Sequence, residues 1–183
     1  MFFLAILACA PDLQCPVGFV EADDTASRAQ CVFDEASILA LVRTFDDGEL
    51  IKVNAEPYMP PLSATPIRRN TWVSPVAVEC AEDLTAPELF LSIDQDDWSH
   101  DLDHDFPVGT VIIHEAVDGE EAHGVEVKRS DYEDDLGRDW WLRMVTSNGV
   151  IEEPAQYGQA CSSCHNESTR PSEGLWGVPE FAK

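Results

Sequence analysis

Three residues near the end of the sequence have the types and spacing that attach a haem group covalently. The run QACSSCHNES places Cys161 and Cys164 three positions apart, and His165 directly follows the second thiol. In a Cys-x-x-Cys-His motif the two thiols bond to the haem vinyl groups, and the histidine binds the iron from one side. The motif therefore predicts one covalently attached haem c, with His165 as the proximal iron ligand.

Two other uses of these residues remain open. A structural zinc site needs four ligands, and the sequence offers no second Cys or His pair at metal-like spacing. A redox-active thiol pair of the thioredoxin type follows a strand and opens a helix in a βαβ unit, and no such unit is apparent here. A zinc site and a simple disulfide between Cys161 and Cys164 are the alternatives to haem.

The charge of the chain restricts its partners. The 183 residues include 35 acidic and 11 basic side chains, which gives a formal net charge of −24. Such a surface repels nucleic acid and anionic lipid headgroups, so we expect no nucleic-acid partner. A small neutral ligand or a basic redox partner protein is compatible with it. The sequence leaves open whether the chain is a monomer or a homodimer.

The N-terminal sequence MFFLAILACAPDLQC resembles a bacterial lipoprotein signal that ends at a lipidated cysteine, Cys9. Its apolar run is shorter than the roughly 20 residues that span a bilayer, and it ends in small residues, as export signals do. We therefore expect an exported protein, periplasmic or at the cell surface, anchored to a membrane by acyl chains on Cys9. A short buried strand is the alternative.

Two further cysteines enclose a polar loop. Cys15 and Cys31 flank the segment PVGFVEADDTASRAQ, which has a length that disulfides close well, and an exported protein meets oxidising conditions. We predict a disulfide between them. Cys80 remains, and we expect it to be a buried small hydrophobic residue.

One helix and a proline-rich connector are expected before residue 67. The segment 34–45 places Ile38, Leu41, Val42 and Phe45 on one helical stripe, with Asp34 as the N-cap. The four prolines of 54–66 predict an extended connector.

The rest of the chain is rich in predicted strands. Five segments are short, β-branched or aromatic, and bounded by turn residues, namely 71–80, 88–93, 109–117, 123–130 and 139–146. Turns are expected at 106–109 and 147–149. The predicted fold class is α+β, a mainly antiparallel sheet with a few helices.

The late position of the haem motif and the strands before it resemble cytochrome P-460 and its relative, the β-sheet cytochrome c′ (c′-beta). The resemblance covers about 71–176 and rests on FPVGTVIIHE (106–115), GVEVKRSDY (124–132), RDWW (138–141) and CSSCH. Together with the N-terminal features, it predicts four segments: a signal remnant (1–8), a tether with the disulfide loop (9–33), a helix with its connector (34–66) and a haem domain (67–183).

The resemblance also implies a function and some site residues. Members of that family hold one haem c against an antiparallel sheet with one face of the iron open, and they oxidise hydroxylamine or nitric oxide or bind such ligands. The lysine that cross-links to the haem in some members corresponds to His114, so we expect no cross-link here. Their distal arginine falls near Ser74, and their distal carboxylate, a proton acceptor, matches Glu126.

Glu126 and His114 are therefore the candidate catalytic residues beside the haem. Val125 and Val127 flank Glu126 and face the other way in a strand, whereas His114 is a proton shuttle, a propionate partner, a distal ligand or simply a packed histidine. Trp140 and Trp141 lie on opposite faces of their strand, so at most one packs on the haem.

Two other groups of residues are weaker candidates for metal binding. The acidic segment 94–105 imitates the start of a calcium loop but lacks its glycine and its closing glutamate, so we expect a solvated turn. Met59 and Met144 are not expected to bind the iron.

The functional hypothesis is an exported monohaem cytochrome whose open iron site binds or converts nitric oxide or hydroxylamine. An electron-transfer cytochrome that docks to a basic partner is the first alternative, and a haem-free surface lipoprotein is the second. Whether the protein is an enzyme stays open.

Overall fold

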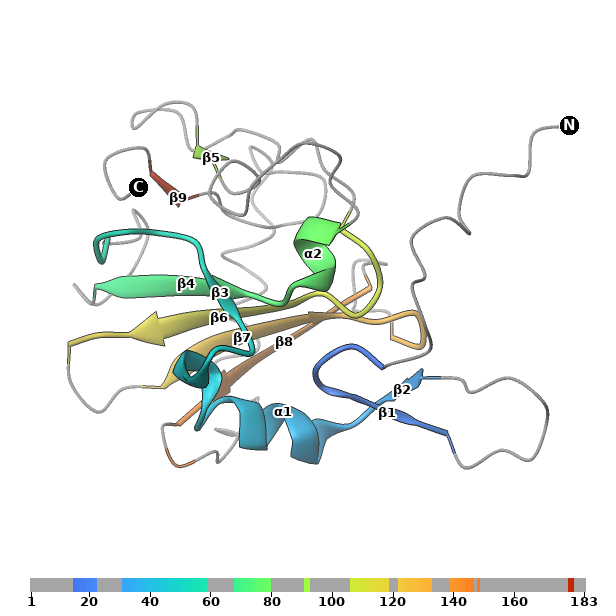
Figure 1. Ribbon diagram of the computed structural model, residues 1–183. Coiled ribbons are helices and arrows are strands. Elements are labelled where there is room, and N and C mark those ends of the chain that lie inside the picture. The colour runs from blue at the N-terminus through green and yellow to red at the C-terminus, as the bar shows by residue number, and fades with distance from the viewer. Residues whose placement is uncertain are drawn as a thin grey trace, which may run out of the picture.

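A five-stranded antiparallel sheet forms the body of the protein. The computed structural model describes residues 15–22, 31–58, 68–79, 91–92, 106–118, 122–132, 139–146, 148 and 178–179. The strand order is β3-β4-β6-β7-β8, and every neighbouring pair is antiparallel (Figure 1). The strands are β3 (Ile51–Lys52), β4 (Arg69–Val73), β6 (Val111–Ala116), β7 (His123–Lys128) and β8 (Trp140–Val145). The expected mainly antiparallel α+β architecture is confirmed.

The two faces of this sheet carry different residues. On one, the helix face, the first helix packs against alternate apolar residues of three strands: Val111, Ile113, Val125, Val127, Trp141 and Val145. The opposite, site face carries a second buried apolar cluster, formed by Val53, Tyr58, Val73, Ala77, Phe106, Ile112 and Trp140. This division follows from the period of two along each strand, which sends neighbouring side chains to opposite faces.

Helix α1 (Glu35–Leu41) is fixed at its start and along one side. The Asp34 carboxylate accepts a hydrogen bond from the backbone N–H of Ser37 at 2.9 Å, as an N-cap does. Ile38 and Leu41 are buried in the helix-face cluster, and each such side chain stabilises the fold by about 1.5–3 kcal/mol. The predicted cap and apolar stripe are confirmed, although the helix is shorter than the segment 34–45.

The chain after α1 turns rather than continuing the helix. The backbone N–H groups of Arg43 and Thr44 bond to carbonyls three residues earlier, and a 3-10 helix, η1, follows at Phe45–Asp47. Gly48 ends it with φ of 100°, a left-handed conformation that glycine adopts without steric penalty.

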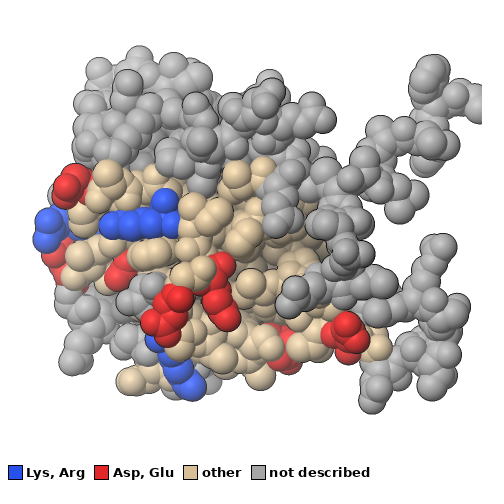
Figure 2. Space-filling model, in the orientation of Figure 1, with Lys and Arg blue, Asp and Glu red and all other residues tan. Residues whose placement is uncertain are grey.

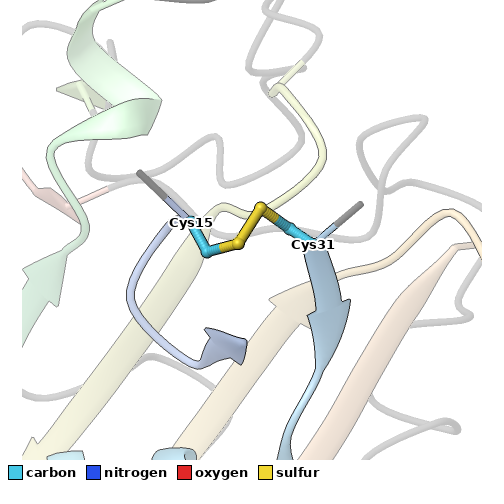
Figure 3. Close-up of a disulfide and its surroundings, with 2 residues drawn as sticks. All are labelled: Cys15 and Cys31. Atoms are coloured by element: carbon cyan, nitrogen blue, oxygen red, sulfur yellow. A yellow bond between two sulfur atoms is a disulfide. The ribbon is translucent and has the colours of Figure 1, made fainter. Parts of the chain in front are cut away.

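A disulfide-linked hairpin precedes α1. Strands β1 (Phe19–Glu21) and β2 (Cys31–Phe33) pair antiparallel, and the predicted disulfide joins Cys15 to Cys31 (Figure 3). The ring of Phe33 lies 5.2 Å from that of Trp141, so the hairpin contacts the helix-face cluster. The hairpin itself was not predicted, because its strands are only three residues long.

The predicted strand at 71–80 is wrong beyond Val73. Helix α2 (Val76–Glu79) follows instead, and the carbonyl of Ser74 accepts from the N–H of Ala77. Proline in the first turn after a serine is a common way to begin a helix, and Ser74-Pro75 supplies that pair. Ser74, the expected position of the family arginine, uses its hydroxyl to accept from the N–H of Val111 at 2.9 Å.

The remaining strands form a small separate sheet. Strand β5 (Leu91–Ser92) pairs parallel with β9 (Val178–Pro179), and β5 lies within the predicted strand 88–93. Figure 1 shows these two strands and α2 on the side of the main sheet away from α1. In the part of the chain that the structure describes, no helix is long and apolar enough to cross a bilayer.

Candidate functional site

A row of four polar side chains crosses the site face. The Tyr58 hydroxyl lies 2.7 Å from Oγ1 of Thr71, which lies 3.1 Å from Nδ1 of His114. The other ring nitrogen of His114, Nε2, lies 3.3 Å from Oε1 of Glu126. The two candidate catalytic residues are therefore in contact, and Thr71 and Tyr58 extend the row.

Strand pairing explains why these residues meet. Thr71 of β4 lies directly opposite His114 of β6, and residues paired in this way point to the same face. On the other side of β6, Gly124 lies opposite His114 and Glu126 lies opposite Ile112. Glu126 is therefore the diagonal neighbour of His114, within reach of a long side chain. Tyr58 joins through an isolated antiparallel bridge to Arg69.

Gly124 leaves room for the imidazole. A Cβ atom at this position would lie 3.5 Å from Cβ and 3.6 Å from Cδ2 of His114, which is ordinary contact distance. A longer side chain on the same face would meet the ring. The absence of a side chain at Gly124 thus lets His114 lie over β7 and reach Glu126.

Most of the row is buried beside apolar residues. Thr71 is fully buried, Tyr58 is buried in the site-face cluster, and the side chain of Glu126 is 5% exposed. The side chain of His114 is 20% exposed, so it connects the buried carboxylate to the surface. A buried carboxylate needs polar or charged partners, and the imidazole of His114 is one of them.

Burial also keeps the Tyr58 phenol protonated. Removal from water raises the pKa of Tyr58 to about 12; the Thr71 hydrogen bond opposes this, the charge of Glu126 adds a smaller increase, and the charge of Arg69 a smaller decrease. Tyr58 therefore has a hydrogen to donate throughout the physiological pH range. Its hydroxyl anchors the far end of the row.

His114 contacts neighbouring side chains through both ring nitrogens rather than facing a metal site. Both of its ring nitrogens have side-chain partners, Thr71 and Glu126, so neither is turned toward a metal. A histidine between a carboxylate and a hydroxyl passes protons in many enzymes. Of the roles that the sequence left open for His114, this geometry disfavours the distal iron ligand.

A second polar group lies on the helix face. The Glu115 carboxylate accepts from Asn70 at 2.8 Å and from the Trp72 indole at 3.0 Å, and Nδ1 of His123 accepts from the N–H of Ala116 at 3.1 Å. Burial lowers the pKa of His123. These hydrogen bonds satisfy polar groups within packed structure and mark no ligand site.

The structure describes only some of the other residues for which the sequence made predictions. Cys9, Cys80, Met59, the segment 94–105 and the haem motif Cys161, Cys164 and His165 lie outside the described residues. Trp140 and Trp141 do lie on opposite faces, with Trp140 beside Phe106 on the site face. Among the described residues, no three His, Cys, Asp or Glu side chains form a group that could hold a metal ion.

Sequence reasoning missed Tyr58 and Thr71. Thr71 could have been placed on the site face from its alternation with Trp72 in β4, but its partner across the sheet depends on the register. Tyr58 lies in the region predicted as a connector and has no periodic pattern around it. Only the bridge to Arg69 brings its hydroxyl to Thr71.

Three basic residues in or next to the strands of the main sheet lie close to carboxylates. Arg68 forms a two-point ion pair with Asp118, Arg129 pairs with Asp131, and the nearly buried Lys128 lies 3.9 Å from Asp139 and over the Trp140 ring. On the face shown in Figure 2, the acidic and basic side chains of the described residues are interspersed with neutral ones. Within these residues, that face carries no large patch of one sign.

Comparisons of the chain with protein-family models, with curated proteins and with solved structures gave no match. The resemblance to cytochrome P-460 therefore rests on the sequence motifs alone.

Proposed function

We propose that the protein is an exported monohaem c-type cytochrome whose iron binds or converts a small nitrogen or oxygen species, such as nitric oxide or hydroxylamine. Cys161 and Cys164 would hold the haem, and His165 would be the proximal iron ligand. The proposal is carried by the contact between His114 and the buried carboxylate of Glu126, an acid–base pair on an apolar face of the sheet. The Cys-x-x-Cys-His motif indicates haem c, and an acid–base pair beside a haem can take up protons from a ligand bound to the iron.

The chemistry of the site face fits a haem ligand pocket. Phe106, Ile112 and Trp140 are apolar and buried, and a buried carboxylate with an imidazole partner stands among them. A haem supplies an iron that binds the ligand and exchanges electrons with it, while the protein controls access and protons. In this division Glu126 accepts a proton that the ligand releases, and His114 contacts the carboxylate and holds it in place.

An electron-transfer cytochrome is the second candidate, because the net charge of −24 suits docking to a basic partner. Electron transfer alone has no use for a buried acid–base pair, so the His114–Glu126 contact favours the ligand-binding function. A haem-free surface lipoprotein is the third candidate. In all three cases we propose that acyl chains on Cys9 anchor the protein to a membrane.

Optical spectra of the purified protein in both oxidation states, with and without nitric oxide, test the proposal. We expect a high-spin, five-coordinate haem that changes its spectrum on adding nitric oxide. A low-spin, six-coordinate haem whose spectrum does not change on adding nitric oxide would indicate the electron carrier. Absence of haem after expression with a haem-attachment system would indicate the surface lipoprotein.

A further inference from the structure

We propose that Thr71 and Tyr58 are positioning residues that fix the tautomer of His114, with the ring proton on Nε2 facing Glu126. With a neutral imidazole, the row Tyr58–Thr71–His114–Glu126 allows three arrangements, since a hydroxyl donates one hydrogen and can accept two. In the first, each residue donates toward Glu126. In the second, each donates toward Tyr58. In the third, Tyr58 and Nδ1 of His114 both donate to Thr71, whose own hydrogen then has no acceptor among the described residues.

The Tyr58 end of the row selects the first direction. In it, the Tyr58 hydroxyl donates to Thr71, the Thr71 hydroxyl donates to Nδ1 of His114, and the Nε2–H donates to Glu126. In the second direction the Thr71 hydrogen would point at the Tyr58 oxygen. The phenol hydrogen would then have no acceptor, because Thr71 is the one hydrogen-bond partner of the Tyr58 hydroxyl among the described residues.

The burial of Thr71 and Tyr58 further favours the first direction. Thr71 is fully buried, so water does not compete for its hydroxyl, and Tyr58 remains a protonated donor. The backbone also holds Thr71 in place, because its N–H donates to Oδ1 of Asn54 at 2.6 Å. Buried hydrogen-bond rows of this kind keep one direction because reversing one bond leaves another donor without an acceptor.

The consequence for the site, which rests on the proposed function, concerns proton uptake. An Nε2–H that already points at Glu126 stabilises the carboxylate as an anion and holds it in one orientation before the ligand arrives. An N–H or O–H bond of the ligand then breaks, and its proton forms an O–H bond on Glu126. Thr71 and Tyr58 act on this step only through His114.

Nitrogen NMR of the protein labelled with 15N-histidine reads the tautomer directly, because protonated and unprotonated ring nitrogens resonate far apart. The sample is the full chain, reduced and saturated with carbon monoxide where haem is attached, so that the iron is diamagnetic. His114→Gln assigns the resonances. Glu126→Gln then removes the carboxylate, after which Thr71 alone directs the ring, and Thr71→Val or Tyr58→Phe is added to that variant.

We expect the Nε2–H tautomer in the wild type and in Glu126→Gln. Adding Thr71→Val or Tyr58→Phe should remove the downfield resonance of an unprotonated Nδ1 and replace it with an averaged one. His123 is the internal control, since the N–H of Ala116 fixes its tautomer on the opposite face and its signals should stay unchanged in every variant.

An Nδ1–H tautomer in the wild type would overturn the inference. So would loss of the Nε2–H tautomer in Glu126→Gln alone, because Glu126 rather than Thr71 would then direct the ring. An averaged signal with Thr71→Val but not with Tyr58→Phe would remove Tyr58 from the proposal. These outcomes do not depend on haem, so a haem-free protein with the expected tautomer would refute the proposed function and leave the positioning intact.

Discussion

Nε2 of His114 lies 3.3 Å from Oε1 of Glu126, across the paired strands β6 and β7. The carboxylate is buried and the imidazole reaches the surface, so the pair links an apolar interior to water. A general base must lie within hydrogen-bond reach of the proton that it abstracts, and a buried carboxylate beside a ligand pocket would meet that condition.

Replacing Glu126 with glutamine should slow any proton-coupled conversion of the ligand by about 10²- to 10⁴-fold, the usual contribution of a general base. Binding of nitric oxide in the dark should change little, since it needs no proton. Steady-state turnover of hydroxylamine and a nitric oxide titration measure the two effects.

Glu115→Gln is the matched control for that variant. Glu115 lies on the helix face, next to His114 in sequence, and accepts from Asn70 and Trp72. The Glu115→Gln variant should turn over hydroxylamine at the wild-type rate. Equal losses in both variants would show that general destabilisation, and not loss of a proton acceptor, slows the reaction.

His123 should make the fold less stable in mild acid. Burial lowers its pKa below the ordinary value of 6.5, so the unfolded chain takes up a proton more readily than the folded protein does. Its contribution to stability is complete above about pH 6.5, and it is lost as the pH falls from there toward the lowered folded value.

His123→Asn isolates this effect, because the asparagine oxygen replaces Nδ1 as the acceptor for Ala116 and does not titrate. Urea unfolding at about pH 8 and about pH 5 should show a smaller loss of stability in the variant than in the wild type. An identical loss in both proteins would mean that His123 is not the group responsible.

The disulfide should contribute measurably to stability. Cys15 and Cys31 are 16 positions apart, and closing a loop of about that size stabilises a fold by about 3 kcal/mol. The variant Cys15→Ser/Cys31→Ser should unfold at lower urea concentration by a corresponding amount. Reduced wild-type protein should match the variant; if the oxidised protein matches it too, the hairpin does not depend on the bond.

The part of the site that lies on regular strands could be predicted from the sequence. Alternation along β7 places Glu126 opposite in direction to Val125 and Val127, and the structure confirms that both valines pack on the helix face. The apolar stripe and cap of α1 were predictable for the same reason, since a periodic pattern determines which side is buried.

Contacts that depend on register or on irregular backbone could not be predicted. Alternation does not say which residue of β4 lies opposite His114, so Thr71 was missed. Tyr58 reaches Thr71 from a segment without periodicity, through the single bridge to Arg69. The pair Ser74-Pro75 is a helix-start signal, but the apolar residues on both sides of it favoured the prediction of one longer strand.

The intact mass of the purified protein, expressed with a haem-attachment system, tests the central claim most directly. The wild-type chain should carry the added mass of one haem that survives denaturation, because two thioether bonds hold it. The variant Cys161→Ala/Cys164→Ala should lack that mass. A wild-type chain of bare polypeptide mass, or a variant that retains covalent haem, would contradict the account.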